Sequence, residues 1–189
     1  DTRAPFNIYA ALGPVLQVTP PEAAECNYTQ PDLDPTIDVQ ITQEIHDLAK
    51  ELEYSPARIF EHVSNTIEFE PYFGSLKGSM GTLVSGSGNA TDQASLTIAL
   101  LRASNIPARY VKGQVQFDGD QRLLDWVGAK TYAAVKNILA VGKIPVTSSG
   151  TILGFTHVWV EACVPYTNYR VMAINNTGHT RIPFDPRFK

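Results

Sequence analysis

Apolar residues in the first half of the chain recur every three or four positions, as they do along one face of a helix. One such set predicts an amphipathic helix over residues 39–53: Ile41, Ile45, Leu48, Ala49 and Leu52. A second set predicts the next helix: Ile59, Phe60, Val63 and Ile67. Ser55-Pro56 supplies the N-cap and the first-turn proline that begin this second helix. Residues 70–78 contain proline and glycine and should form a loop.

A third helix is expected over residues 90–104, after the flexible glycine- and serine-rich stretch 85–88. Its inner stripe would consist of Ala94, Ile98 and Leu101. Asn105 suits the left-handed conformation that ends a helix, and Pro107 prevents the helix from continuing.

After Pro107 the pattern changes to alternation of apolar and polar residues, which is the period of a strand. The expected elements are a strand over 109–117, a turn at 118–120, a helix over 129–141, a strand over 157–164, a turn near 166–168, and strands near 169–174 and 181–185. Helices followed by strands predict an α+β fold with an antiparallel sheet. Residues 1–37 are rich in proline and should form an extended arm or linker, with the folded domain over residues 38–189.

The composition is that of one globular domain. The chain has 189 residues, of which 43% are hydrophobic and 18% charged, so a full core is expected and disorder is not. A net charge of -4 excludes the basic footprint of a nucleic-acid-binding protein. No run of about 18 apolar residues predicts a membrane span. Histidines and cysteines do not cluster at metal-ligand spacing, and we expect neither a metal nor a cofactor.

Cys26 and Cys163 are the only cysteines. They fit either a disulfide in a secreted protein or two reduced thiols in a cytosolic one. The chain begins at Asp1 without a methionine, and we interpret it as a piece of a larger, multidomain bacterial protein that is secreted or lies in the cell envelope. The sequence leaves the oligomeric state open.

Three segments carry a resemblance to a known family. The first is Gly88-Asn89-Ala90-Thr91-Asp92-Gln93-Ala94, which continues to Leu100-Leu101-Arg102-Ala103 and Ile106-Pro107-Ala108-Arg109-Tyr110-Val111. The others are His157-Val158-Trp159-Val160-Glu161 and Ile182-Pro183-Phe184-Asp185-Pro186. Over roughly residues 40–189 the chain resembles the transglutaminase-like superfamily, whose nucleophile motif usually reads Gly-x-Cys-x-Asp-x-Ala. The resemblance implies a papain-like fold with a nucleophile helix packed on an antiparallel sheet.

The resemblance also implies a Cys-His-Asp triad at Ala90, His157 and Asp185. A cysteine at a helix N-terminus forms a thiolate readily, a histidine takes its proton, and an acid orients that histidine. Alanine at position 90 has no ionisable atom. We therefore expect His157 and Asp185 to form a hydrogen-bonded pair with no thiol to activate.

No other residue is expected to replace the missing thiol. Cys163 lies six positions beyond His157 on the same predicted strand, roughly 20 Å away, and nothing in the sequence brings Cys26 to His157. Ser87 and Thr91 lie near position 90, but a hydroxyl needs stronger activation, and Thr91 should point off a different side of the helix.

Each site residue also has a purely structural interpretation. His157 fits a satisfied structural histidine, Asp185 a turn residue, and Asp92 a favourable charge in the first helical turn, which we prefer to a catalytic role. Structural ion pairs are expected for Arg102 and Arg109. Trp126 and Trp159 are expected in the core.

Three functions fit the missing thiol. The favoured one is a non-catalytic module that binds a peptide or protein partner, because Gln93 and Ser95 also depart from the family's usual residues. The alternative is a thiol acyltransferase, peptidase or deamidase in which cysteine has been replaced at position 90. The third is a structural module with no site.

Overall fold

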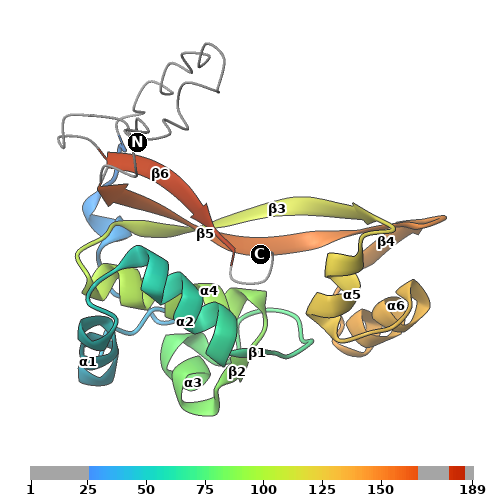
Figure 1. Cartoon of the computed structure of the whole chain (residues 1–189), viewed down its shortest axis with the longest axis horizontal. Coiled ribbons are helices and arrows are strands. Elements are labelled where there is room, and N and C mark those ends of the chain that lie inside the picture. The colour runs from blue at the N-terminus through green and yellow to red at the C-terminus, as the bar shows by residue number, and fades with distance from the viewer. Residues whose placement is uncertain (1–25, 166–178, 186–189) are drawn as a thin grey trace, which may run out of the picture.

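The computed structural model describes residues 26–165 and 179–185 and confirms an α+β fold with an antiparallel sheet. Four helices precede most of the sheet: α1 (Gln43–Glu51), α2 (Pro56–Thr66), α3 (Gly78–Ser85) and α4 (Ala90–Ala103). They gather at one end of the long strands (Figure 1). None of the described helices is long and apolar enough to cross a membrane.

The predicted helices α2 and α4 are confirmed, whereas α1 begins later than expected. Residue Thr42 has extended backbone at the N-cap position, so the helix starts at Gln43 rather than at residue 39. Val39 is instead fully buried outside the helix. Helix α3 was not predicted, because Gly78 and Gly81 are poor helix formers and obscure its periodicity.

The stretch before α4 is ordered by pairing, where the sequence predicted only flexibility. Strand β2 (Ser87–Gly88) pairs in parallel with β1 (Glu68–Phe69). Helix α4 then runs through the middle of the fold, and every side chain from Asp92 to Arg102 is buried. The sequence predicted a buried stripe on one side of α4, but the helix is buried on all sides. It is contacted by α1, α2 and α3 and also by strands β3 and β5 of the sheet. Asn105 has the predicted left-handed conformation, with φ 58°.

The sheet is built on a long antiparallel pair, β3 (Ala108–Asp118) and β5 (Ile152–Pro165). These strands pair from Ala108↔Ala162 to Asp118↔Ile152. On the other edge of β5, β4 (Val146–Ser149) pairs with its beginning and β6 (His179–Phe184) with its end. The ladder partners leave a gap at residues 156–159, between β4 and β6.

Most predicted strands are confirmed, with corrections to their bounds. The strand expected at 157–164 lies within the longer β5, and the one expected at 181–185 is β6. Helix α6 (Tyr132–Val141) matches the predicted helix near 129–141, whereas α5 (Gln121–Val127) and β4 were missed because both are short. The turn expected near 166–168 and the strand near 169–174 lie outside the described residues.

Two hydrophobic cores use opposite faces of β5. The first core packs α1, α2 and α4 against even-numbered positions of the strand: Val158, Val160, Ala162 and Val164. The second packs α5 and α6 against odd-numbered positions: Leu153 and Phe155. Because side chains alternate along a strand, the cores lie on opposite faces at opposite ends. The twist of the long ribbon brings both groups of helices below it in Figure 1.

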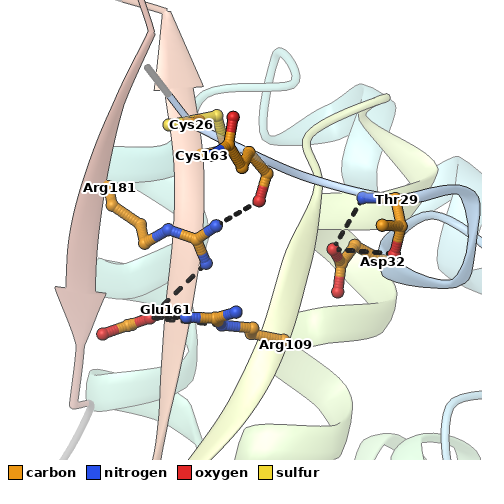
Figure 2. The surroundings of a disulfide bond; sticks show 8 residues. Cys26, Thr29, Asp32, Arg109, Glu161, Cys163 and Arg181 are labelled. Carbon is orange, nitrogen blue, oxygen red and sulfur yellow. Dashed lines mark hydrogen bonds and ion pairs between the residues drawn. A yellow bond between two sulfur atoms is a disulfide. The ribbon is translucent and has the colours of Figure 1, made fainter. Parts of the chain in front are cut away.

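Cys26 and Cys163 form a disulfide. The sequence left open whether these two cysteines are paired. Figure 2 shows the bond joining the start of the described chain to β5. Nearby, Glu161 makes ion pairs with Arg109 at 2.9 Å and with Arg181 at 3.6 Å. Residue Arg181 also donates to the backbone carbonyl of Asn27. The disulfide and Arg181 thereby hold the end of the N-terminal segment against the sheet.

Candidate active site

His157 and Asp185 form the hydrogen bond predicted from the sequence. Nε2 of His157 lies 2.8 Å from Oδ2 of Asp185. His157 lies in the gap of the β5 edge, and Asp185 directly follows β6, whose last residue Phe184 pairs with Val160. The pairing of β6 with β5 thereby places the Asp185 carboxylate next to the His157 imidazole. The imidazole is 2% exposed and the Asp185 side chain 22% exposed, so the pair is largely protected from water.

Aromatic rings enclose the imidazole on several sides. Trp126 of α5 meets it edge-on with ring centroids 5.7 Å apart, Phe155 does so at 6.4 Å, and Trp159 stacks on it at 6.2 Å. Gly113, opposite His157 in the register, makes room for Trp159, because a Cβ there would lie 2.8 Å from the indole. The packing fixes the plane of the ring that Asp185 holds.

A pocket of about 290 Å³ joins His157 to the beginning of α4. Its walls come from the loop before α3, the N-terminal turn of α4, β3, α5 and the middle of β5. The lining residues are Phe69, Tyr72, Phe73, Gly74, Asn89, Ala90, Thr91, Lys112, Trp126, Ile144, Phe155, Thr156, His157 and Val158. Ala90 and His157 thus share one pocket, whereas Asp185 supports His157 from outside its lining.

The first turn of α4 also anchors the loop that forms one wall of the pocket. The Asn89 carbonyl oxygen Oδ1 accepts the Asp92 backbone N–H and caps the helix. Its amide donates to the carbonyl oxygens of Tyr72 and Gly74. One side chain therefore begins the helix and holds the neighbouring wall.

The fully buried carboxylate of Asp92 holds the same loop more extensively. It accepts hydrogen bonds from the Tyr72 hydroxyl at 2.5 Å, the Ser75 hydroxyl at 3.0 Å and the Gly78 backbone N–H at 2.9 Å. It also accepts the backbone N–H groups of Leu76 and Lys77. Burial and the Asp92 carboxylate both raise the pKa of Tyr72, so its hydroxyl stays a donor. The sequence predicted that Asp92 only places a favourable charge in the first turn of α4, whereas its carboxylate also holds the loop before α3.

Gln93 and Ser95, which depart from the family's usual residues, both have buried partners. The Gln93 amide donates to the carbonyl oxygens of Glu68 and Gly88 and fastens β1 and β2 to α4. The Ser95 hydroxyl lies 2.7 Å from the Tyr110 hydroxyl on β3. Both departures fit the surrounding structure.

Several structural expectations need correction. Thr91 lines the pocket beside Ala90 instead of pointing away from it, and Trp126 lines the pocket as well as packing in the core. Arg102 donates to the carbonyl oxygens of Ala108 and Asp34 and has no ion pair within the described part of the chain. The predicted ion pair of Arg109 is confirmed, with Glu161 as its partner.

Most walls of the pocket lie outside the three motif segments, so the sequence did not predict them. Phe69, Phe73 and Ile144 come from segments without a recognisable motif. Among residues 26–165 and 179–185, no group of three or more His, Cys, Asp or Glu side chains is placed to hold a metal ion.

Residues 39–174 match the sequence pattern of the Transglutaminase-like superfamily. This match covers more than half of the chain, and the protein belongs to that superfamily. No curated protein matches the chain.

Three solved structures resemble the chain at low sequence identity. A candidate cysteine protease from Cytophaga hutchinsonii is 20% identical, with a TM-score of 0.42, and the match covers 79% of this chain and 60% of that one. The periplasmic domain of TgpA from Pseudomonas aeruginosa is 19% identical, with a TM-score of 0.40, and the match covers 82% of this chain and 45% of that one. The same domain bound to ethylmercury is 18% identical, with a TM-score of 0.38, covering 79% and 46%. The chain thus spans less than two thirds of each.

Proposed function

We propose that this transglutaminase-like domain binds a peptide or protein partner in the pocket between α4 and β5 and has no thiol-dependent catalysis. The observation that carries the proposal is Ala90 at the first position of α4, in the same pocket as the paired His157. A methyl group can neither attack a carbonyl nor give a proton to the imidazole. Both cysteines of the chain are joined in the disulfide, and no described cysteine is free.

The pocket supports a binding role by its size and lining. Its volume of about 290 Å³ lies near the lower end of the range for ligand sites and suits one or two residues of a peptide. Phe69, Phe73 and Phe155 give it apolar walls, while the His157 imidazole adds a polar group. Apolar walls with few polar groups are typical of binding sites that bury a side chain.

The partners of Gln93 and Ser95 favour an old binding module over a single recent loss of cysteine. Their hydrogen bonds to Glu68, Gly88 and Tyr110 tie three strands to α4. Replacing one nucleophile would not require such contacts. A wider reorganisation of the structure around α4 would require them. It would also displace the donors of an oxyanion hole, which tolerates little displacement.

The disulfide supports a location outside the cytoplasm, because disulfides persist mainly in oxidising compartments. We propose that the domain is secreted or lies in the cell envelope as part of a larger bacterial protein.

A second candidate function is thiol-dependent acyl transfer or peptide hydrolysis by a form with cysteine at position 90. The His157–Asp185 hydrogen bond favours it, since this pair orients an imidazole as a base. With Nε2 held by Asp185, a thiol at position 90 would pass its proton to Nδ1. The thiolate would then attack an amide carbonyl, the C–N bond would break as the His157 imidazolium returns the proton to the leaving amine, and an acyl-thioester would remain.

An assay of the chain and of Ala90→Cys separates the two functions. The unaltered chain should give only background turnover of glutamine donors and peptides. The new cysteine would be the one thiol outside the disulfide, at a helix N-terminus beside His157, so it should react with iodoacetamide near pH 6 faster than a surface thiol of pKa about 8.5. His157→Ala should remove that advantage, and turnover should stay low.

Two results would contradict the binding module. Turnover by the unaltered chain that His157→Ala abolishes would reveal a nucleophile other than cysteine. Full turnover in Ala90→Cys would favour the disarmed enzyme.

A further inference from the structure

We infer that the pocket selects a peptide segment in which an apolar side chain lies next to a carboxylate. This inference rests on the proposed binding function and names its ligand class. It combines the apolar walls of the pocket with the charge of one lysine, Lys112, in its lining.

The fold places Lys112 beside the first turn of α4. Ser95 of α4 contacts Tyr110 of β3 at 2.7 Å. Thr91 lies one helical turn before Ser95 on α4, about 6 Å from it. Lys112 lies two residues after Tyr110 on β3, about 7 Å from it and on the same face of the strand. Because α4 and β3 run in opposite directions, both steps lead to the same place, and Thr91 and Lys112 both line the pocket there.

Lys112 brings a positive charge to the lining of the pocket. Its register partner is Val158, and no ion pair of Lys112 occurs within residues 26–165 and 179–185. None of the described residues that line the pocket is Asp or Glu. Two acids that contact pocket-lining residues are engaged elsewhere: Asp185 holds His157, and Asp92 holds the loop before α3.

Alanine at position 90 sharpens this charge imbalance. In a thiol enzyme the thiolate at this position would itself provide a negative charge next to the N-terminus of the helix. Here the pocket has an exposed ammonium group at its lining and no acidic side chain among its described lining residues, so the ligand should supply the anion. A carboxylate beside Lys112, with its apolar neighbour against Phe69 and Phe155, satisfies both features.

Four short acetylated peptides test the inference and distinguish the two sources of a carboxylate. One pair is Ac-Gly-Phe-Gly with a free or an amidated C-terminus, and the other is Ac-Gly-Phe-Asp-Gly-amide and its Asn counterpart. Calorimetric titration of the chain should give about fivefold or greater tighter binding for at least one carboxylate peptide over its neutral partner. The preference should shrink between roughly 50 and roughly 300 mM salt, because screening weakens it.

Variants of lysine locate the effect. Lys112→Gln should remove the carboxylate preference while the amidated Phe peptides bind as before, and Lys112→Arg should retain most of it. Lys50→Gln, an exposed position on α1 that leaves the same net charge, is the matched control and should change nothing. Thermal unfolding checks that each variant folds.

The outcomes distinguish the proposed carboxylate selectivity from the proposed peptide-binding function. Equal binding of acidic and neutral peptides, or a preference that survives Lys112→Gln, overturns the carboxylate selectivity and leaves the peptide-binding pocket standing. Binding of the neutral peptides that Trp126→Ala abolishes supports the pocket itself. Failure of all four peptides to bind contradicts both proposals.

Discussion

The two ends of the β3–β5 ribbon are built differently. At one end α4 is surrounded by helices and sheet, and 18 described residues form its buried core. At the other end the two short helices α5 and α6 cover a core of six buried residues among those described. The candidate site lies between these ends, with Ala90 and Asn89 from the first and Trp126 and Phe155 from the second. The larger core positions the chemical groups, and the smaller one supplies an apolar wall.

The largest expected difference between the ends is the cost of a cavity. Leu100 and Leu139 are both fully buried, one in each core. We expect Leu100→Ala to lower the free energy of unfolding by about 4 kcal/mol and Leu139→Ala by about 2–3 kcal/mol, because the smaller core can collapse around the lost methyl groups. Urea unfolding of both variants measures the difference. Equal losses would show that the two cores are equally rigid.

The disulfide should stabilise the first end alone. It closes a segment of 137 residues and lies on β5 opposite the face that α4 covers. Replacing Cys26 and Cys163 by alanine should cost about 3 kcal/mol, since the unfolded chain then gains freedom. Reduction of the unaltered chain is the control and should cost a similar amount. Hydrogen exchange should rise near Cys163 and stay unchanged in α6; exchange that rises uniformly would contradict this localisation.

Asp92→Asn should disturb the connection between the first end and the pocket. The buried carboxylate accepts five hydrogen bonds, and an amide would turn donors toward the donors of Tyr72 and Gly78. We expect a loss of about 2–3 kcal/mol in unfolding free energy. Asp125→Asn, on the exposed surface of α5, is the matched control and should cost little. An equal loss of unfolding free energy in both variants would show that the hydrogen bonds of Asp92 do not stabilise the loop.

Gly142→Ala should disturb the same wall from the second end. A Cβ at Gly142 would lie 2.4 Å from the carbonyl oxygen of Pro71, so the loop before α3 must move. The expected cost is about 1–2 kcal/mol, with nuclear magnetic resonance shifts at Tyr72 and Phe73. Gly128→Ala is the control, because it strains a left-handed residue with nothing within 4 Å and should leave the pocket unshifted.

The smallest expected effect is a pH dependence confined to the first end. Burial lowers the pKa of His62 on α2 below its usual 6.5, and Glu51 opposes this only in part. As pH falls from about 7.5 to about 5, the unfolded chain takes up the proton first, so this contribution to stability is present at the higher pH and lost at the lower one. The difference between the two pH values should shrink in His62→Gln, measured by urea unfolding. A larger dependence in the variant would reverse the assigned direction.

Local patterns were sufficient for the elements that carry strong signals. The apolar spacing of Ile59 and Val63 predicted α2, and the change of period after Pro107 predicted the strand that follows. The patterns did not predict the short elements α5 and β4, which are too brief to show a period, or α3, whose period is obscured by two glycines. The motif register predicted the contact of His157 with Asp185, since both residues lie in segments of the family pattern.

The sequence by itself determined the class of fold, the end of α4 just before the left-handed Asn105, and the absence of a thiol at position 90. These follow from local periodicity, backbone preference and the identity of one side chain. Only the tertiary structure decided that Cys26 reaches Cys163, that Asp92 holds the loop before α3, and that Lys112 shares a pocket with Ala90. Such contacts join segments far apart in the chain, and their partners depend on how β3, β5 and α4 pack. No local pattern carries that information.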